Sequence, residues 1–477
     1  MFVVVRFWLA FLEKDWFPRL WPKRQQIPSS MLAAAGFFCF SSLPVQARPL
    51  AELLDLARAS EPNYLAAKAN WLATQAKKRQ AVGSLLPQLS ASAGTNANYR
   101  NYTTIDSPFP PDRDYFKSGS AQLNLTQPLW RYASLVEVRQ ADASMTQAEL
   151  QFYAAEQELR ARVTAAWLDV LAARDTVQFN ASQLATAQLQ WKVANRAADL
   201  GTGGLPQAEE ARARYQQAVA EQAAAEAERD TKLAALEQLA GPLALFTPAT
   251  LKEQDGTGNL TLEALENWLA AADATSPRVL AAQRGLEAAR AEISKQQAGH
   301  QPTLDIVGSY GNSSQTVGTT PRQSGYQNLQ ASIGLQLNIP IYSGGTQSAK
   351  VSEALAAEER AIQELEGARR ESILSIKQAW FNARAARVKV DRARASAEAA
   401  GVLLRAAQSG EQKGLKTRLE VLQAEQQLAA VQRDLRKGIY DQLAAYIRLK
   451  AVSGQLLAAD IATVDARFVA SDNGAAR

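Results

Sequence analysis

The chain has 477 residues, of which 47% are hydrophobic and 21% are charged, and this composition excludes a disordered chain. The formal net charge is +5, but residues 1–47 carry five of the 52 basic and two of the 47 acidic residues. The rest of the chain is therefore nearly balanced in charge, which leaves no basic excess of the kind that nucleic-acid binding requires.

Residues 1–47 are predicted to be an export signal with an extended leader. The stretch 31–47, MLAAAGFFCFSSLPVQA, has an apolar centre behind basic residues and ends in the small-x-small pattern VQA, which predicts cleavage before Arg48. Because the basic leader of such a signal is usually short, both Met1 and Met31 remain candidates for the translation start.

The single cysteine, Cys39, lies inside this predicted signal. It follows Gly36-Phe37-Phe38, which is not the small-residue pattern that lipoprotein processing prefers, so lipid attachment is disfavoured. The mature chain would then hold no disulfide, thiolate metal site or cysteine nucleophile. After residue 47 no run approaches the roughly 18 apolar residues of a membrane-spanning helix, so any membrane segment is expected to consist of strands.

Residues 48–260 are predicted to form one structural repeat of helix, two strands, long helix and helix. A helical pattern over 50–84 is broken at Glu61-Pro62-Asn63, which predicts a cap and a restart. After Leu89 the composition changes to Ser, Ala, Asn, Thr, Gly and Tyr as far as Tyr102, and beyond a loop rich in Pro and Asp apolar and polar residues alternate with period two in 121–128. This alternation predicts two antiparallel strands joined by an exposed loop.

The stretch from Ala133 to Leu200 has neither Gly nor Pro over 68 residues and is rich in Ala, Gln, Glu, Arg and Leu. We expect one continuous helix of roughly 100 Å. A single globular domain cannot bury such a rod, so other long helices must lie beside it. A glycine-rich turn follows it, a second helix is predicted from Gln207 to Ala240, and residues 241–258 are predicted to be irregular.

Residues 261–457 repeat this design as a second structural repeat, and residues 458–477 remain as a C-terminal tail. A helix is predicted over 277–299, strands between Leu304 and Ile341, and a long helix from Thr346 towards Ser409. Equivalent landmarks lie 212 to 215 residues apart along the sequence: Pro87 and Pro302, Pro128 and Pro340, Trp167 and Trp380, Gly201 and Gly414.

The element lengths predict how each repeat packs. In each half the two shorter helices, of about 35 residues each, together match the long one, so we expect them to stack end to end beside it. Four strands per chain would leave both edges of an open sheet unpaired, and unpaired backbone groups are costly in a membrane. Closure of the sheet therefore requires several chains.

The chain resembles the TolC family of outer-membrane channels over essentially its whole mature length. The resemblance is carried by LLPQL at 85–89, QPLW at 127–130, IPIYSGG at 339–345 and GLKTRLEVLQAE at 414–425. It implies a mainly α fold with a membrane β-barrel: a long-helix α-barrel continuous with a trimeric twelve-stranded β-barrel, built from two internal repeats. It also implies the outer membrane of a Gram-negative bacterium as the location, with most of the chain in the periplasm.

The function implied by the resemblance is passive conduction. A homotrimer in outer-membrane lipid would receive cargo from an inner-membrane transporter of ABC type through a periplasmic adaptor, or membrane fusion, protein. No phosphate-binding loop is present, so energy would come from the transporter. No cofactor, metal, nucleic acid or enzymatic activity is expected, and the only histidine, His300, is interpreted as a capping or solvent group.

The resemblance also places a periplasmic gate at two helix-turn-helix tips. Glu420 matches a gate carboxylate, and three copies on one axis would repel one another and prefer cations or a pairing base. Lys416 matches a gate arginine that ties neighbouring helices. The chain departs from the family at Gln423, where a second carboxylate is common, and at Pro206 and Gln207, which replace a polar pair.

The adaptor-docking residues implied by the resemblance lie at the same tips: Leu200, Gly201, Thr202, Lys413, Gly414 and Leu415. A simpler interpretation of Glu420 and Lys416 is also open, namely two charges four residues apart on a solvated helix face. Trp167 and Trp380 are interpreted as packing residues.

Two cargo classes compete within this family. The missing lipoprotein cysteine and the opening helix ARASEPNYLAA at 57–67 favour type I secretion of unfolded protein over efflux of small molecules or metal ions by a tripartite pump. A remote alternative is an exported structural coiled-coil protein without a pore. The four alternating strands and the duplication disfavour it, because a filament needs neither.

Overall fold

A computed structural model of the chain describes residues 50–102, 112–242, 249–251, 262–319 and 323–470. All of these residues belong to one compact unit. The predictions for residues 1–47, including the cleavage site, the start at Met1 or Met31 and the role of Cys39, lie outside the described residues.

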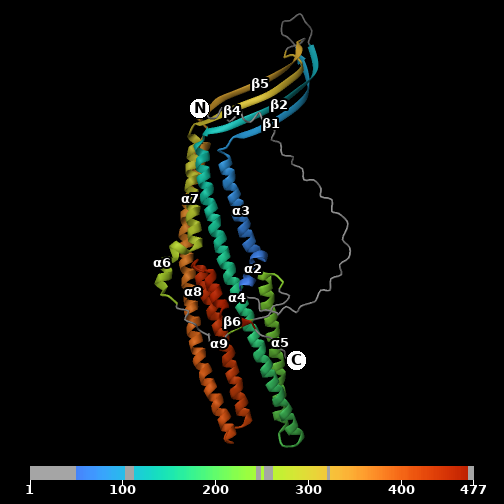
Figure 1. The fold of residues 1–477 in the computed structure, drawn as a ribbon, viewed down its shortest axis with the longest axis vertical. Coiled ribbons are helices and arrows are strands. Elements are labelled where there is room, and N and C mark those ends of the chain that lie inside the picture. The colour runs from blue at the N-terminus through green and yellow to red at the C-terminus, as the bar shows by residue number, and fades with distance from the viewer. Residues whose placement is uncertain (1–49, 103–111, 243–248, 252–261, 320–322, 471–477) are drawn as a thin grey trace, which may run out of the picture. The chain divides into compact units, whose positions relative to one another are not determined.

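Most of the described chain is helical (Figure 1). The predicted rod is a single 68-residue helix, α4, and its counterpart α8 runs without a break through Gly367 and Gly401. No helix among the described residues is both long and apolar enough to cross a bilayer. The helices are α2 (Leu50–Ser60), α3 (Pro62–Gly83), α4 (Tyr132–Asp199), α5 (Leu205–Ala240), α6 (Leu265–Thr275), α7 (Pro277–Gln297), the 3₁₀ turn η1 (Ala298–His300), α8 (Thr346–Gln412), α9 (Arg418–Val452) and α10 (Ala458–Asp465).

The predicted restart at Glu61 is confirmed. Pro62 occupies the first turn of α3, where its missing N–H would have no helical partner in any case. The Glu61 carboxylate accepts a hydrogen bond from the Tyr64 backbone N–H at 2.6 Å and forms an ion pair with Arg162. A buried carboxylate thus joins the start of α3 to α4.

The long helices form the layer that the element lengths predict. Both α3 and α5 pack on α4, and both α7 and α9 pack on α8. Packing of α7 and α9 on α4 joins the two repeats. Across the layer, α3 and α5 therefore come first, followed by α4, then by α7 and α9, and finally by α8. The outer members of the layer are α3 and α5 on one side and α8 on the other.

Four antiparallel strands form the main sheet in the order β1-β2-β4-β5. They are β1 (Gln88–Tyr102), β2 (Asp112–Trp130), β4 (Thr303–Val317) and β5 (Ser324–Asn338). The strand predicted from residue 121 begins earlier, because the ladder is extended by an Arg100–Asp114 ion pair and by contact of the Tyr99 and Tyr115 rings. The edges of this sheet are β1 and β5.

The structure corrects the prediction of an irregular segment at 241–258. Residues 249–251 form a short strand, β3 (Ala249–Leu251), which pairs antiparallel with β6 (Phe468–Ala470). Helix α6 was not predicted either. The partner of β3 lies more than 200 residues away in sequence, so no local sequence pattern predicts this pairing. The segment predicted to be a C-terminal tail contributes α10 (Ala458–Asp465) and β6 to the fold.

The main hydrophobic core lies where α2, α4, α9, α10 and the β3–β6 pair meet, and we name it the junction. Trp167 of α4 is 1% exposed and meets the Phe468 ring edge-on, with centroids 4.6 Å apart. Leu456 and Leu443 are also fully buried. Trp167 is thus a packing residue, as predicted. Trp380 is partly buried and packs against a second core cluster that includes Ile376, which also confirms the prediction, and its indole N–H donates to the Glu263 carbonyl at 3.0 Å.

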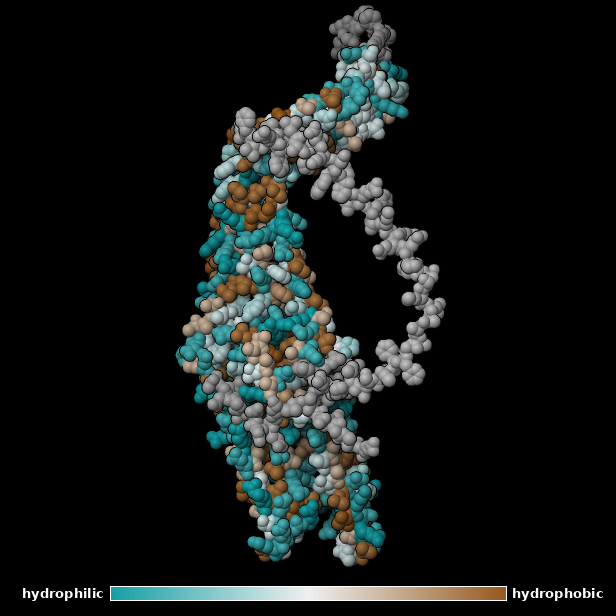
Figure 2. Space-filling view, viewed as in Figure 1, coloured by the Kyte–Doolittle hydropathy of each residue, from teal (hydrophilic) through white to brown (hydrophobic). Residues whose placement is uncertain are grey.

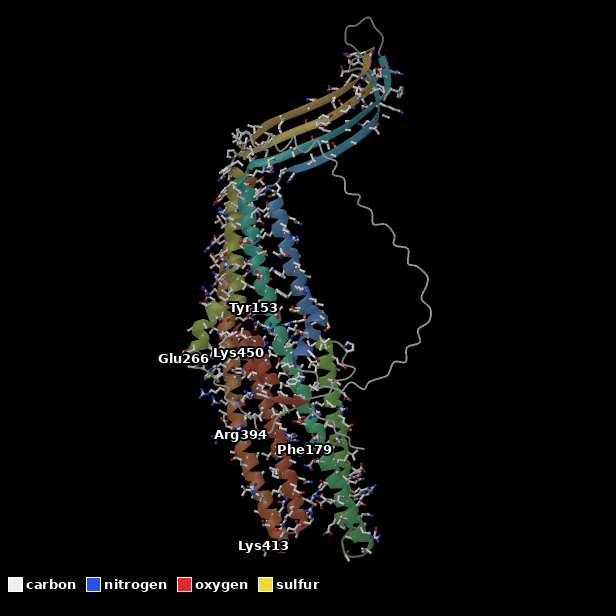
Figure 3. All side chains as sticks on the ribbon, in the orientation of Figure 1. Tyr153, Phe179, Glu266, Arg394, Lys413 and Lys450 are labelled. Atoms are coloured by element: carbon white, nitrogen blue, oxygen red, sulfur yellow. The ribbon has the colours of Figure 1, made fainter. Side chains whose placement is uncertain are left out.

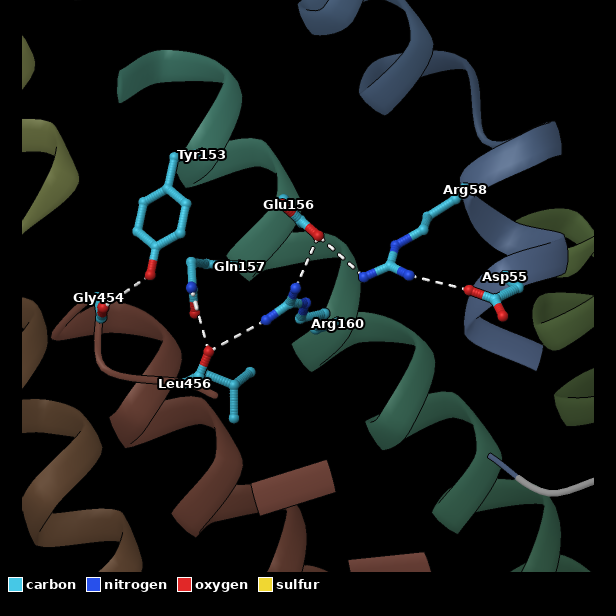
Figure 4. Close-up of polar contacts among 8 residues, drawn as sticks. All are labelled: Asp55, Arg58, Tyr153, Glu156, Gln157, Arg160, Gly454 and Leu456. Carbon is cyan, nitrogen blue, oxygen red and sulfur yellow. Dashed lines mark hydrogen bonds and ion pairs between the residues drawn. The ribbon is translucent and has the colours of Figure 1, made fainter. Parts of the chain in front are cut away.

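A polar network ties the C-terminal segment to this core (Figure 4). The Glu156 carboxylate of α4 accepts from Arg58 at 2.9 Å and from Arg160 at 2.7 Å. Arg160 and Gln157 both donate to the Leu456 carbonyl at 3.2 Å. The turn after α9 is therefore held against α4 by hydrogen bonds as well as by apolar packing. Away from the junction, the visible surface mixes hydrophilic and hydrophobic residues along the helices (Figure 2).

Candidate functional site

The two repeats place equivalent turns at the ends of their helical hairpins. Gly201 after α4 and Gly414 after α8 both adopt a left-handed backbone, with φ of 70° and 71°, which favours glycine and ends a helix. The N–H of Thr202 donates to Ala197 at 3.0 Å, and the N–H of Leu415 donates to Gly410 at 2.8 Å. The two turns are thus closed by the same local chemistry.

The six residues predicted to dock an adaptor all lie in these turns and are exposed. Leu200 is 63% exposed and Leu415 is 79% exposed, so each turn presents one large apolar side chain next to its glycine. Lys413 marks the end of the α8–α9 hairpin in Figure 3. The remaining members of this set are Gly201, Thr202 and Gly414.

Glu420 lies in the first turn of α9 and forms a capping box with Thr417. Its Oε2 accepts from the Thr417 backbone N–H at 2.7 Å and from the Thr417 hydroxyl at 3.0 Å, and its own N–H donates to the Thr417 Oγ1 at 3.3 Å. These backbone and side-chain hydrogen bonds, together with the nearby charge of Lys416, hold the pKa of Glu420 below its usual range. The carboxylate is therefore ionised at neutral pH.

Lys416 precedes the cap of α9, and its side chain lies over Gly410 at the end of α8. The simpler interpretation, two charges on one solvated helix face, therefore does not describe the pair, because Lys416 is not in the helix. Gln423 is exposed on α9, and Gln207 accepts from the Gly204 N–H at 3.3 Å at the start of α5. Among the described residues, the hydrogen bonds of Gln207 and Glu420 run to the caps of their own helices.

Sequence reasoning missed a buried polar contact between the two hairpins. The Tyr440 hydroxyl of α9 donates to Asp175 Oδ2 of α4 at 2.9 Å, and both residues are buried. Arg436 lies 3.9 Å from the same carboxylate, and Arg433 covers the Phe179 ring at 4.4 Å. Burial, then the Asp175 charge, raises the pKa of Tyr440, so the phenol remains a neutral donor.

A sequence signal for Asp175 did exist. It lies four residues after Leu171 and eight after Trp167, on the apolar face of a helix that is otherwise predicted to pack. A carboxylate at such a position requires a partner. The partner, Tyr440, lies 265 residues away in sequence, and only the tertiary structure identifies it.

His300 is exposed at the end of η1, as expected of a solvent group. Across the described ranges, no cluster of three or more His, Cys, Asp or Glu residues is arranged to hold a metal ion.

Comparison with known proteins gives a consistent result. The family model described as "Outer membrane efflux protein" matches residues 53–242 and 268–455, one match per repeat. The alkaline protease secretion protein AprF of Pseudomonas aeruginosa is 28% identical over 431 residues, 89% of each chain. The outer membrane protein TolC of Vibrio cholerae is 27% identical over 444 residues, 93% of this chain and 98% of the relative.

A solved structure extends the likeness to the fold. The CmeC outer membrane channel of Campylobacter jejuni matches with a TM-score of 0.68 at 16% identity, over 93% of this chain and 97% of that one. The fold and the two-repeat design expected from the sequence are thereby confirmed.

Proposed function

Because the chain belongs to the outer membrane efflux protein family, we propose that it is the exit channel of a type I secretion system and conducts unfolded protein. It is an outer-membrane channel protein of TolC type, as its relatives are. The cargo class, the partners and the gate are the parts that this proposal adds.

The observation that carries the proposal of a channel is that both the sheet and the helical layer end in elements with no neighbour on their outer side among the described residues. The sheet ends in β1 and β5, whose outer backbone groups have no strand beside them in the order β1-β2-β4-β5. The helical layer likewise ends in α5 on one side and α8 on the other. Three copies arranged about one axis would close twelve strands into one sheet and the helices into one ring around a passage.

Protein cargo is favoured over small molecules by the relative AprF, whose name assigns it to alkaline protease secretion. The opening helix and the missing lipoprotein cysteine favour the same branch. The alternative cargo is a small molecule or metal ion handed over by a tripartite pump.

We assign docking of a periplasmic adaptor, and through it an ABC-type transporter, to the two hairpin turns. Leu200 and Leu415 offer exposed apolar contacts there, next to the left-handed backbone of Gly201 and Gly414. Three ionised Glu420 side chains near the axis would form a cation-selective constriction, with Lys416, Gln423 and Gln207 beside it.

Deletion of the gene in its own host tests the cargo. We expect specific proteins to disappear from the culture supernatant, as measured by mass spectrometry, while sensitivity to dyes, detergents and metal salts is unchanged. Complementation with the wild-type gene should restore them. An unchanged supernatant together with increased sensitivity would overturn protein cargo in favour of efflux.

Single-channel conductance in planar lipid bilayers tests the gate. Glu420→Gln is expected to reduce cation selectivity, because it removes charge from the constriction without changing side-chain size. The matched control is Glu411→Gln, which removes a carboxylate from the end of α8 in the same turn. Equal effects of the two variants would contradict a special role for Glu420.

A further inference from the structure

Helix α8 has a second apolar face that the rest of the described chain leaves exposed. Its buried face, which includes Ala383 and Val390, packs on the neighbouring helices. On the opposite side an exposed stripe follows heptad spacing, and each member is between 51% and 55% exposed: Leu374, Phe381, Val388 and Val402. Large apolar side chains at this spacing are typical of a seam between helices. We name this set the α8 stripe.

The surface around the stripe is hollowed and basic. Phe381 and Val388 border a shallow concavity whose other lining residues are Arg384, Ala385, Lys389 and Arg392. Lys377 lies one turn earlier and is exposed. A partner helix for this face should therefore bring small residues opposite the large ones and acidic residues beside them.

The outward face of α5 has these properties. Its buried face includes Ala218 and Ala225, which lie toward α4. The opposite face carries an exposed alanine at every seventh residue, which we name the α5 stripe: Ala213, Ala220, Ala227 and Ala234. Asp230 and Glu237 flank it and are exposed or half-buried.

Contacts within the chain put the two stripes at matching heights. Lys389 of α8 pairs with Asp441 of α9 at 3.2 Å. The adjacent Tyr440 bonds Asp175 of α4 at 2.9 Å. Asp175 lies between two links from α4 to α5: Asp169 to Lys232 at 2.9 Å, and Asn180 to the Glu221 carbonyl at 3.1 Å. Residue 388 of α8 is therefore level with about residue 227 of α5.

Rotation about a symmetry axis that runs along the helices leaves height unchanged. Residues at the same height in one chain are thus at the same height in its neighbours. We propose that α8 of one chain packs antiparallel on α5 of a second copy, with Phe381 against Ala234, Val388 against Ala227 and Val402 against Ala213. The inference rests on the proposed channel of several copies and specifies its helical seam and register.

The charges beside the stripes agree with this register. At matching heights Arg384 comes beside Asp230, and Lys377 comes beside Glu237. Opposite charges in register favour the correct pairing, because a shift by one heptad in either direction would leave one such pair instead of two. Large-to-small packing of Phe381 and Val388 on alanines lets the two helices approach closely.

Cysteine cross-linking tests the register in the full chain. Val388→Cys with Ala227→Cys should give covalent trimers under a mild oxidant, because each chain then supplies one cysteine to each of two seams. Val388→Cys with Ala213→Cys is the matched control, since Ala213 lies 14 residues away, roughly 21 Å along the helix. Each single variant controls for random collision.

A several-fold excess of cross-linked trimer for the first pair over the second supports the proposed seam. Equal cross-linking of both pairs, or failure of the first, overturns it. Planar-bilayer conductance of the same uncross-linked preparations separates the two proposals. Normal channels without cross-linking overturn the register alone, whereas absence of channels and of cross-linking overturns the channel as well.

A charge exchange gives an independent readout. Arg384→Glu should reduce the yield of the matched cross-linked trimer several-fold, and adding Asp230→Arg should restore it. Failure of the second substitution to restore the yield contradicts the proposed pairing. If an adaptor rather than a second copy covers the α8 stripe, cross-linked trimers will not form in purified protein, which also overturns the proposal.

Discussion

The junction and the hairpin turns are built from the same helices but stabilised in different ways. At the junction Trp167 is 1% exposed and Leu456 is fully buried, since residues of the C-terminal segment cover α4. At the turns Leu200 is 63% and Leu415 79% exposed. The comparison teaches that the chain buries large side chains where α10 and β6 cover α4, whereas each hairpin turn leaves its large apolar side chain exposed.

The largest expected effect comes from breaking the junction. Trp167→Ala would remove a buried indole that packs on Phe468, and such truncations cost about 3–5 kcal/mol. Trp191→Ala is the matched control, because Trp191 stacks on Tyr215 at 5.3 Å in the α4–α5 hairpin and is only half-buried. Thermal unfolding of detergent-solubilised protein, followed by circular dichroism, measures both variants. Equal losses would remove the distinction between the two regions.

A smaller loss of stability is expected from removing the hydrogen bond between Tyr440 of α9 and Asp175 of α4. Tyr440→Phe leaves the buried Asp175 carboxylate without its phenol donor, which should cost about 2 kcal/mol. Because the pKa of Tyr440 is raised above the ordinary 10.0, its stabilisation is complete below pH 10 and is lost as the pH rises further toward the folded-state pKa. Tyr215→Phe, in the hairpin, serves as the control. Chemical unfolding at pH 7 and above pH 10 measures the difference, and an unchanged stability of Tyr440→Phe at pH 7 would contradict the expected contribution.

The smallest loss of stability is expected from removing the charge of a carboxylate at the start of a helix, either Glu61 or Glu420. Burial by itself would raise the pKa of Glu61, but hydrogen bonds from Tyr64, Arg162 and Asn63 outweigh it and hold the pKa below the ordinary 4.5. Its stabilisation is therefore present above pH 4.5 and lost as the pH falls through the lower folded-state pKa. Glu61→Gln should cost about 1 kcal/mol at pH 7.

The difference between Glu61→Gln and wild type should vanish in acid, as measured by unfolding between pH 7 and pH 3. Glu420→Gln is the matched variant at the hairpin turn, where the pKa is also lowered, first by the hydrogen bonds from Thr417. Because Glu420 is exposed, we expect a smaller stability change than for Glu61→Gln. A larger loss for Glu420→Gln would contradict the ranking of the two regions.

Much of the fold could be predicted because its signals are local. The absence of Gly and Pro between Ala133 and Leu200 predicts α4 to within a residue or two at each end. Glu61-Pro62 predicts the start of α3, and the offset between Trp167 and Trp380 predicts the duplication. These features depend on backbone propensity, capping and period, which neighbouring residues decide.

The two hairpin turns were predictable from the sequence, but the hydrogen bonding around them was predictable only in part. The glycine turns at Gly201 and Gly414 are visible in the sequence, since only a few residues end a helix in this way. The capping box between Glu420 and Thr417 follows from their spacing of three residues. Lys416 lies outside α9 because the N-cap of the helix is Thr417. The spacing between Lys416 and Glu420 does not indicate the position of this cap.

By itself the sequence determined the long helices and the four main strands, because each follows from residues within a few turns or one hairpin. It also determined their duplication, because the same landmarks recur in both halves of the chain. Only the tertiary structure decided that β3 pairs with β6, that Asp175 bonds Tyr440 and that the turn at Leu456 is held on α4. These contacts join residues hundreds of positions apart. Their free energy depends on burial and on distances that exist only once the helices are packed.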